Sequence, residues 1–274
     1  MPSSAALKQP SRERVLIVVR TYPVPSQKSV EVSCTAGVTS AGDWIRLFPI
    51  PYRFMQMDKR FHKYQEIDVD IVKAPRDQRP ESFRINDLDS IEIVVPEPLS
   101  TKNHWDARWR RLEHLLKHCM CCIEKERKAS GSPTLGFFKP AEIEAFEIEQ
   151  TTDHWTDSEL TKLRQFTLWG ETPPQELEKV PFQFRYRYRC PHDFCNGHRQ
   201  SCIDWEMGAL FRKLRTKHGE QWEVPFRQRY EEEMFTQNDT YFFVGNMNQY
   251  PASWLVVGLW YPRRGPRQLT LNME

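Results

Sequence analysis

The sequence lacks a long hydrophobic segment. No apolar run in its 274 residues approaches the ~20 residues that a helix needs to cross a bilayer. The stretch from Met1 to Arg14 is polar and has no apolar core of the kind that a secretory signal requires. From these absences we predict that the chain has neither a membrane span nor a secretory signal, and we expect a cytoplasmic location.

The short motifs of the common enzyme classes are also absent. The chain has no Walker loop, no G-x-S-x-G nucleophile elbow, no dinucleotide fingerprint and no H-E-x-x-H zinc motif. The sequence therefore does not establish an enzyme and favours a non-enzymatic function. If the protein is an enzyme, we expect a nuclease.

Cysteine is scarce, and its odd count of seven does not suit a disulfide framework. Three of the seven stand close together with a histidine in the pattern C-x4-C-x2-H-x3-C. The four residues of this pattern are Cys190, Cys195, His198 and Cys202. Zn²⁺ prefers four N or S ligands in a closed tetrahedral site, and Asn196-Gly197 allows the loop to turn tightly. The pattern predicts a structural zinc site, in which His192 is an alternative to His198.

Two of the remaining cysteines form a C-x2-C pair. Cys119 and Cys122 could indicate redox or metal chemistry, but they fall in the stretch His104–Lys128, where Trp and Leu recur at helical spacing. This periodicity predicts an amphipathic helix with Asn103 as its N-cap. Because free cysteine behaves as a small hydrophobe on such a face, we predict that both thiols pack in the core.

Short β-branched runs separated by glycine and proline dominate the first hundred residues. The expected strands are Val15–Val19, Ser29–Ala36, Trp44–Phe48, Glu66–Lys73 and Ser90–Val95. About five short strands in roughly eighty residues favour a small OB-like β-barrel over a sandwich.

The C-terminal half mixes strands and helices. Phe182–Arg189 alternates aromatic side chains with arginine, which predicts a half-buried strand leading into the zinc loop. Ser201-x-x-Asp204 resembles a capping box, and an apolar stripe at helical spacing follows it. A further helix is expected at Val224–Phe235, with strands at Tyr241–Val244 and Ser253–Tyr261.

The predicted fold class is therefore α+β: an N-terminal OB-like barrel, a helical segment and a zinc-pinned α+β region. The predicted divisions are a disordered tail at 1–12, the barrel at 13–100, a helical connecting segment at 101–172 and the zinc-binding domain at 173–274.

Charge is nearly balanced at +2, so an argument for nucleic-acid binding depends on how the charge is distributed locally. Positive residues outnumber negative ones between Phe184 and Lys217. The candidate contacts are Arg46, Arg185, Arg187, Arg189, Arg199, Arg212 and Lys213. Cations bind phosphates, and neighbouring aromatic rings stack on unpaired bases. The same arginines could instead form only a solvated sheet face.

Five short segments of the sequence resemble a scattered family of uncharacterised bacterial proteins. They are Cys34-Thr-Ala-Gly37, the stretch from Gly42 to Ile50, Arg79-Pro-Glu-Ser82, Phe184–Glu206 and Phe242–Asn246. The first two segments also resemble the opening of proteins with a dual OB-containing domain. That resemblance implies an OB-type barrel and, by analogy, nucleic-acid binding.

These features leave three candidate functions. The first is a bacterial, zinc-stabilised nucleic-acid-binding protein. The second is a metal-dependent nuclease of a defence or mobile-element system, for which the candidate carboxylates are Asp68, Asp70, Asp77, Glu81, Asp204 and Glu206. The third is a scaffold that binds a partner protein through zinc-supported aromatic surfaces.

Overall fold

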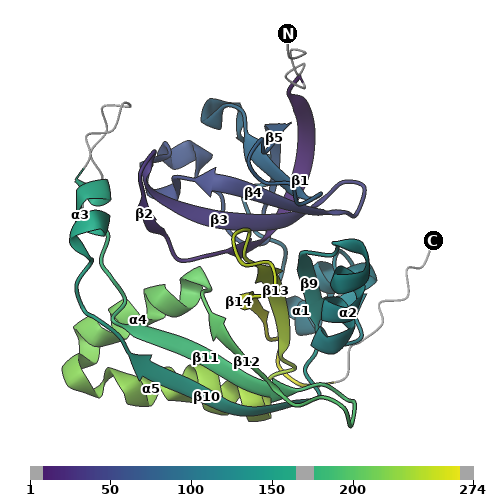
Figure 1. Cartoon of the computed structure of the whole chain (residues 1–274), viewed down its shortest axis with the longest axis vertical. Coiled ribbons are helices and arrows are strands. Elements are labelled where there is room, and N and C mark those ends of the chain that lie inside the picture. Colours follow the sequence, from purple (N-terminus) through teal and green to yellow (C-terminus); the bar gives the residue numbers. More distant parts are fainter. Residues whose placement is uncertain (1–8, 165–175, 266–274) are drawn as a thin grey trace. The chain divides into compact units, whose positions relative to one another are not determined.

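The computed structural model describes residues 9–164 and 176–265, which separate into two compact units (Figure 1). The first unit contains residues 9–98 and the described residues of 158–177, the first of which lie in the short helix α3 (Asp157–Leu163). The second unit contains Leu99–Asp157 and residues 178–265. No helix in the described ranges is long and apolar enough to cross a membrane.

The first unit is a closed five-stranded barrel. Its strands are β1 (Ser11–Arg20), β3 (Val30–Thr39), β4 (Trp44–Ile50), β5 (Glu66–Lys73) and β6 (Ser82–Ile85). They pair in the order β1-β3-β4-β6-β5, and β5 pairs back with β1 to close the barrel. Two short strands extend the pairing, β2 (Val24–Ser26) on β3 and β7 (Glu92–Ile93) on β5. A five-stranded barrel of this kind is compatible with an OB-like fold.

The barrel core follows from the alternation of side chains along its strands. In β5, Ile67, Val69 and Ile71 point inward and are buried, while Asp68 and Asp70 between them face outward. β5 has the predicted bounds, and β1, β3 and β4 extend beyond theirs. The predicted tail was too long, because Ser11 already pairs with Ile71 of β5; residues 1–8 lie outside the described residues.

The second unit is built on a seven-stranded sheet in the order β10-β11-β12-β14-β13-β9-β8. These strands are β8 (Leu116–Lys117), β9 (Leu135–Phe138), β10 (Glu142–Gln150), β11 (Phe182–Arg189), β12 (His198–Cys202), β13 (Tyr241–Asn246) and β14 (Trp254–Trp260). The predicted α+β class is confirmed. β9 and β10 lie inside the segment that we expected to be helical.

Helices cover one face of the β10–β12 part of this sheet (Figure 1). They are α4 (Trp205–His218), α5 (Glu223–Arg227) and the π-helical segment Gln228–Gln237. Phe184 of β11 packs against Phe226 of α5 with the rings tilted and 4.7 Å between their centroids, and the Tyr186 hydroxyl donates to the Tyr230 carbonyl at 2.7 Å. The aromatic residues of β11 therefore build the core, and its arginines occupy the opposite face.

The predicted helix over His104–Lys128 was wrong. Within α1 (Lys102–Trp109), three consecutive residues starting at Asn103 have positive φ, so Asn103 is not an N-cap. The chain then forms β8, and a separate helix, α2 (Met120–Ser130), begins after Cys119 and ends at the left-handed Gly131. Trp105 and Trp109 pack on Trp260 of β14, at 5.1 and 6.0 Å between ring centroids. Contacts with the sheet thus satisfy the apolar side chains without a continuous helix.

The cap of α4 also differs from the prediction. Asp204 rather than Ser201 is the N-cap, and its side chain accepts from the Glu206 amide at 2.9 Å. Ser201 lies within β12, opposite Arg185 of β11.

Candidate metal centre

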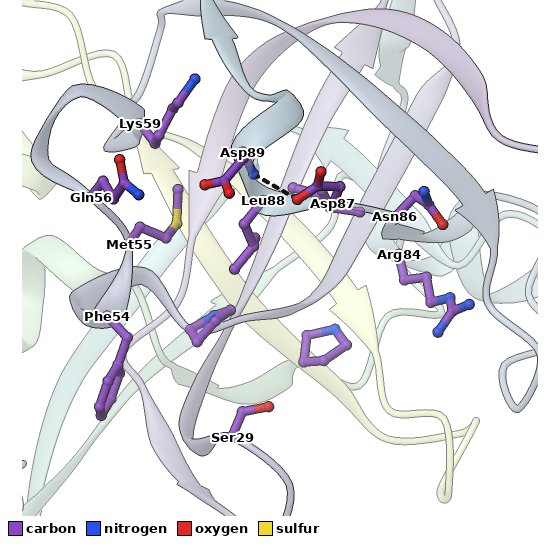
Figure 2. Close-up of a pocket in the computed structure, with 13 residues that line it drawn as sticks. Ser29, Phe54, Met55, Gln56, Lys59, Arg84, Asn86, Asp87, Leu88 and Asp89 are labelled. Carbon is purple, nitrogen blue, oxygen red and sulfur yellow. Dashed lines mark hydrogen bonds between the residues drawn. The ribbon is translucent and has the colours of Figure 1, made fainter. Parts of the chain in front are cut away.

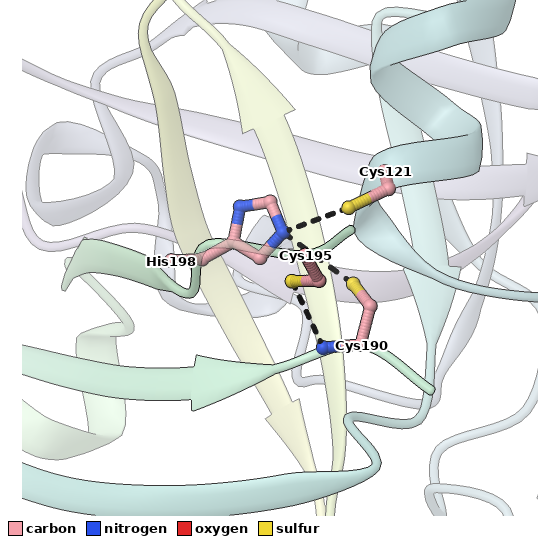
Figure 3. Close-up of side chains that lie close together, drawn as sticks. All are labelled: Cys121, Cys190, Cys195 and His198. Carbon is pink, nitrogen blue, oxygen red and sulfur yellow. Dashed lines mark hydrogen bonds between the residues drawn. The ribbon is translucent and has the colours of Figure 1, made fainter. Parts of the chain in front are cut away.

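Four metal-ligand side chains converge between α2 and the loop that joins β11 to β12 (Figure 3). They are Cys121, Cys190, Cys195 and His198, and their ligand atoms all lie within 4.8 Å of one another. His198 Nε2 is 3.3 Å from Cys121 Sγ and 3.4 Å from Cys190 Sγ. A tetrahedral metal with bonds of about 2.3 Å to sulfur and 2.0–2.1 Å to nitrogen separates such atoms by about 3.5 Å. The side chains are therefore already spaced to hold one metal ion.

The strands and the loop position three of these ligands. β11 and β12 pair with Tyr188 opposite His198, so Cys190 leaves one strand close to where His198 begins the other. The connecting loop turns at Gly197, whose φ of 86° favours glycine. The His198 ring lies on the Tyr188 ring at 5.1 Å between centroids, which fixes its orientation.

Backbone contacts hold the loop around the cysteines. The Cys190 amide donates to Cys195 Sγ at 3.3 Å, and the Cys195 amide donates to the His192 carbonyl at 2.9 Å. Arg189 donates to the Cys195 carbonyl at 3.2 Å. Contacts outside the ligand set are typical of metal centres, because they orient the ligands.

Burial controls the ionisation of the cluster. It raises the pKa of Cys121 to about 11 and that of Cys190 to about 12, and it lowers the pKa of His198. Burial also acts to raise the pKa of Cys195, but hydrogen bonds from the Cys190 and Gly197 amides, together with those from the Cys121 and Cys190 side chains, make the net shift downward. These surroundings disfavour uncompensated thiolates, so a bound cation would supply the charge that stabilises them.

Cys202 does not join this group. It ends β12, four residues after His198, which corresponds to about 13 Å along a strand. The residue is 5% exposed and pairs with Phe184 and Val256 in the sheet. Cys121 takes the place that the sequence spacing gave to Cys202. None of the seven cysteines, all of which lie in the described ranges, forms a disulfide bond.

The cluster lies within a region that a family model matches. The model of the family described as "Domain of unknown function (DUF8757)" matches residues 116–274, more than half of the chain. The chain belongs to the DUF8757 family. A second model, "Domain of unknown function (DUF8758)", matches residues 11–114, which include the barrel strands. No curated protein matches the sequence. Neither family description names a metal or an activity.

Four of the predicted nucleic-acid contacts share one face of the DUF8757 sheet, where glutamates of β10 meet them. Each of the four arginines forms an ion pair across the strands. The pairs are Arg185 with Glu149, Arg187 with Glu144 at 3.2 Å, Arg189 with Glu144 at 2.5 Å and Arg199 with Glu147 at 2.6 Å. Four guanidinium groups thus face three carboxylates. The face, which we call the arginine face, is close to neutral.

The other three predicted contacts lie elsewhere. Arg46 on β4 is 4% exposed and lies 3.7 Å from Glu81, so its guanidinium is not available to a phosphate. Arg212 and Lys213 are on α4, which packs on the aromatic side of β11 through Phe211. The structure therefore does not bring them to the arginine face.

The candidate nuclease carboxylates have structural partners. Asp204 is 2% exposed, and its second carboxylate oxygen accepts from the Leu259 amide at 3.0 Å. Glu206 accepts from the Tyr261 hydroxyl at 3.2 Å. In the barrel, each candidate pairs with an arginine: Asp68 with Arg14, Asp70 with Arg12, Asp77 with Arg79 and Glu81 with Arg46. Within the described ranges, no three carboxylates converge on a metal position.

The barrel carries a pocket of about 400 Å³ beside the turns that follow β4 (Figure 2). Phe54, Met55 and Leu88 contribute its apolar lining. Two of its polar groups have local partners, because Lys59 donates to the Ile91 carbonyl and Asp87 accepts from the Asp89 amide. These two polar side chains therefore have partners within the protein, and no ligand is needed to explain their positions.

Proposed function

We propose that the second unit is built around a structural zinc centre held by Cys121, Cys190, Cys195 and His198. The convergence of these four side chains carries the proposal. Three thiolates and one imidazole form a soft donor set of the kind that suits tetrahedral Zn²⁺. The protein supplies all four ligands and leaves no position for substrate, which is the arrangement of a structural site rather than a catalytic one.

The proposed metal would join two distant parts of the chain. Cys121 belongs to the first turn of α2, whereas the other three ligands lie in and next to the β11–β12 loop. Structural zinc contributes directly to folding, with apparent binding energies of roughly 10–16 kcal/mol in zinc-finger peptides at neutral pH. The centre would therefore fix the loop against the helix.

Metal analysis of single-cysteine variants tests this function. The Cys195→Ser variant should lose one zinc equivalent and unfold at a lower temperature, because the metal then lacks a ligand. Cys202→Ser is the matched control, since Cys202 is equally buried but stands outside the group. Elemental analysis and thermal melting measure both effects. Zinc retained in Cys195→Ser, or lost from Cys202→Ser instead, would contradict the assignment.

We propose nucleic-acid binding by the arginine face as a second candidate function. Its support is the register of β11 and β12, which sets Arg187 opposite Arg199 and presents both side chains at 52% exposure. Exposed ion pairs are worth only about 0–1 kcal/mol each. A phosphate backbone could therefore displace the β10 glutamates at little cost.

Charge variants on the two sides of these ion pairs test the second function. Substituting Arg185, Arg187 and Arg189 by Ala should weaken binding to labelled DNA or RNA and reduce its salt dependence, because fewer counterions are released. Glu144→Gln combined with Glu147→Gln should strengthen binding by freeing the cations. Arg215→Ala is the control, because Arg215 forms its ion pair with Glu220 at the end of α4.

The binding titrations cover single- and double-stranded DNA and RNA at low salt. Undetectable binding to all four, or no difference between the arginine and glutamate variants, would argue against the arginine face and favour the protein-scaffold function.

A further inference from the structure

A second group of metal-ligand side chains lies beside the first. Cys119, Cys122 and His192 have ligand atoms that all lie within 4.8 Å of one another. Cys122 Sγ is 3.8 Å from His192 Nε2, close to the separation of about 3.5 Å expected for sulfur and nitrogen on one tetrahedral zinc. The two groups share no residue, so this one can be considered independently of the proposed structural centre.

A fourth side chain stands next to this group. The rings of His118 and His192 are 5.2 Å apart between centroids. Two imidazoles on one tetrahedral zinc, each bound through a nitrogen at 2.0–2.1 Å, place their ring centres about 5 Å apart. His118 is exposed and directly precedes Cys119, so it can turn toward the same point. We propose that Cys119, Cys122, His192 and His118 form a second zinc site.

The first turn of α2 is suited to hold thiolates. Cys119 is the N-cap of the helix, and its sulfur accepts from the Cys122 amide at 3.2 Å. The unpaired amides and the dipole at a helix N-terminus stabilise negative charge. The first group contains the equivalent contact, from the Cys190 amide to Cys195 Sγ. Both groups thus combine a thiol that accepts from a backbone amide with a histidine.

The presence of imidazole distinguishes a metal site from two other uses of the C-x2-C pair. Cys119 is fully buried in the core, as predicted, but core packing alone does not require His192 beside the Cys122 thiol. The two sulfurs lie 2.9 Å apart. Zinc would separate them to about 3.8 Å and a disulfide would draw them to about 2.0 Å. Only the metal also uses the histidine nitrogens.

The two sites would alternate along the same two segments. α2 would give Cys121 to the first site and Cys122 to the second, while the β11–β12 loop would give Cys190 and Cys195 to the first and His192 to the second. The loop would therefore be tied to the first turn of the helix at two points. This arrangement predicts two zinc equivalents per chain.

Zinc counting on the full-length, reduced protein tests the second site, with zinc chloride as the added metal followed by removal of unbound ion. The wild type should carry two equivalents, and His192→Asn should carry one. His154→Asn is the matched control, because His154 is a histidine with an 87% exposed side chain that belongs to neither group, and it should keep two. Cys195→Ser should lose only the first site. Cys119→Ala with Cys122→Ala should lose only the second.

The outcomes separate the two sites. If the wild type carries one zinc equivalent, which Cys195→Ser loses and His192→Asn keeps, the second site is overturned and the first stands. If the wild type carries one zinc equivalent, which His192→Asn loses, the first site is overturned and the second stands. A Cys119–Cys122 disulfide, seen by mass spectrometry as the loss of two hydrogens in protein purified without reductant and carrying one zinc, would assign the pair to redox chemistry instead. Because His192 lies in a loop and is only partly buried, its variant keeps the test informative even if the double cysteine variant fails to fold.

Discussion

At the scale of single residues, Asp204 shows how a carboxylate near a candidate metal-binding loop can be structural. One of its oxygens caps α4 through the Glu206 amide, and the other accepts from the Leu259 amide of β14. The side chain is buried, and both oxygens are engaged by the backbone. Asp204 therefore joins a helix to the sheet, which leaves it poorly placed for the nuclease role.

Removing this carboxylate should destabilise the fold. The Asp204→Ala variant loses a helix cap and leaves a buried amide of β14 without its acceptor, which together should cost about 2–4 kcal/mol. Urea unfolding followed by circular dichroism measures the change. Asp153→Ala is the control, because its carboxylate is exposed and pairs with the neighbouring His154. Equal stability of the two variants would refute the structural role, and divalent-metal-dependent cleavage lost in Asp204→Asn would make the carboxylate catalytic.

Three of the four residues in the candidate zinc centre could be predicted from local spacing. Cys190, Cys195 and His198 stand within one loop and its flanking strand, so their proximity in the sequence implies proximity in space. The fourth residue could not be predicted in this way, because Cys202 lies at the far end of β12 and the position is filled by Cys121 of α2, which is distant in the sequence. The dense run of thiols at Cys119–Cys122 was the available signal, and its interpretation as a core helix face concealed it.

At the scale of secondary-structure elements, alternation predicted some strands well and missed others. β5 has the predicted bounds because its sequence Glu-Ile-Asp-Val-Asp-Ile-Val-Lys alternates without a break. β10 is rich in glutamate, and its pairing with β11 shifts register between Ile143 and Ala145, so its alternation is interrupted. The helix over His104–Lys128 failed for the opposite reason, since its regular periodicity was overridden by packing of its tryptophans on the sheet.

At the scale of the whole molecule, the proposed metal centres distinguish the two units. The barrel closes through strand pairing around an aliphatic core that includes Ile17, Leu47 and Ile67. All ligands of the proposed centres belong to the second unit. Loss of metal should therefore act on the second unit and leave the barrel's own core contacts in place.

Acidification should release zinc and loosen the second unit while the barrel stays folded. Burial raises the pKa of Cys121 to about 11 and of Cys190 to about 12, so in metal-free protein both thiols are protonated throughout the neutral range. Zinc must displace at least these two protons, so its apparent affinity should fall by about 100-fold for each pH unit lowered. Zinc is thus held at high pH and lost as the pH falls.

The barrel should respond in a lower pH range. The Arg14 guanidinium, hydrogen-bonded to Asp68, lowers the pKa of that carboxyl, so this ion pair persists above the ordinary pKa of aspartate and is lost only below it. Equilibrium dialysis between pH 7.5 and about 5 measures zinc retention, and pulsed hydrogen exchange at one fixed pH compares peptides from Phe182–Cys202 with peptides from β5. We expect the peptides from Phe182–Cys202 to lose protection from hydrogen exchange and those from β5 to keep it. The Cys202→Ser variant should behave as the wild type. A zinc affinity that does not change with pH, or simultaneous loss of protection in both peptides, would contradict a metal centre confined to the second unit.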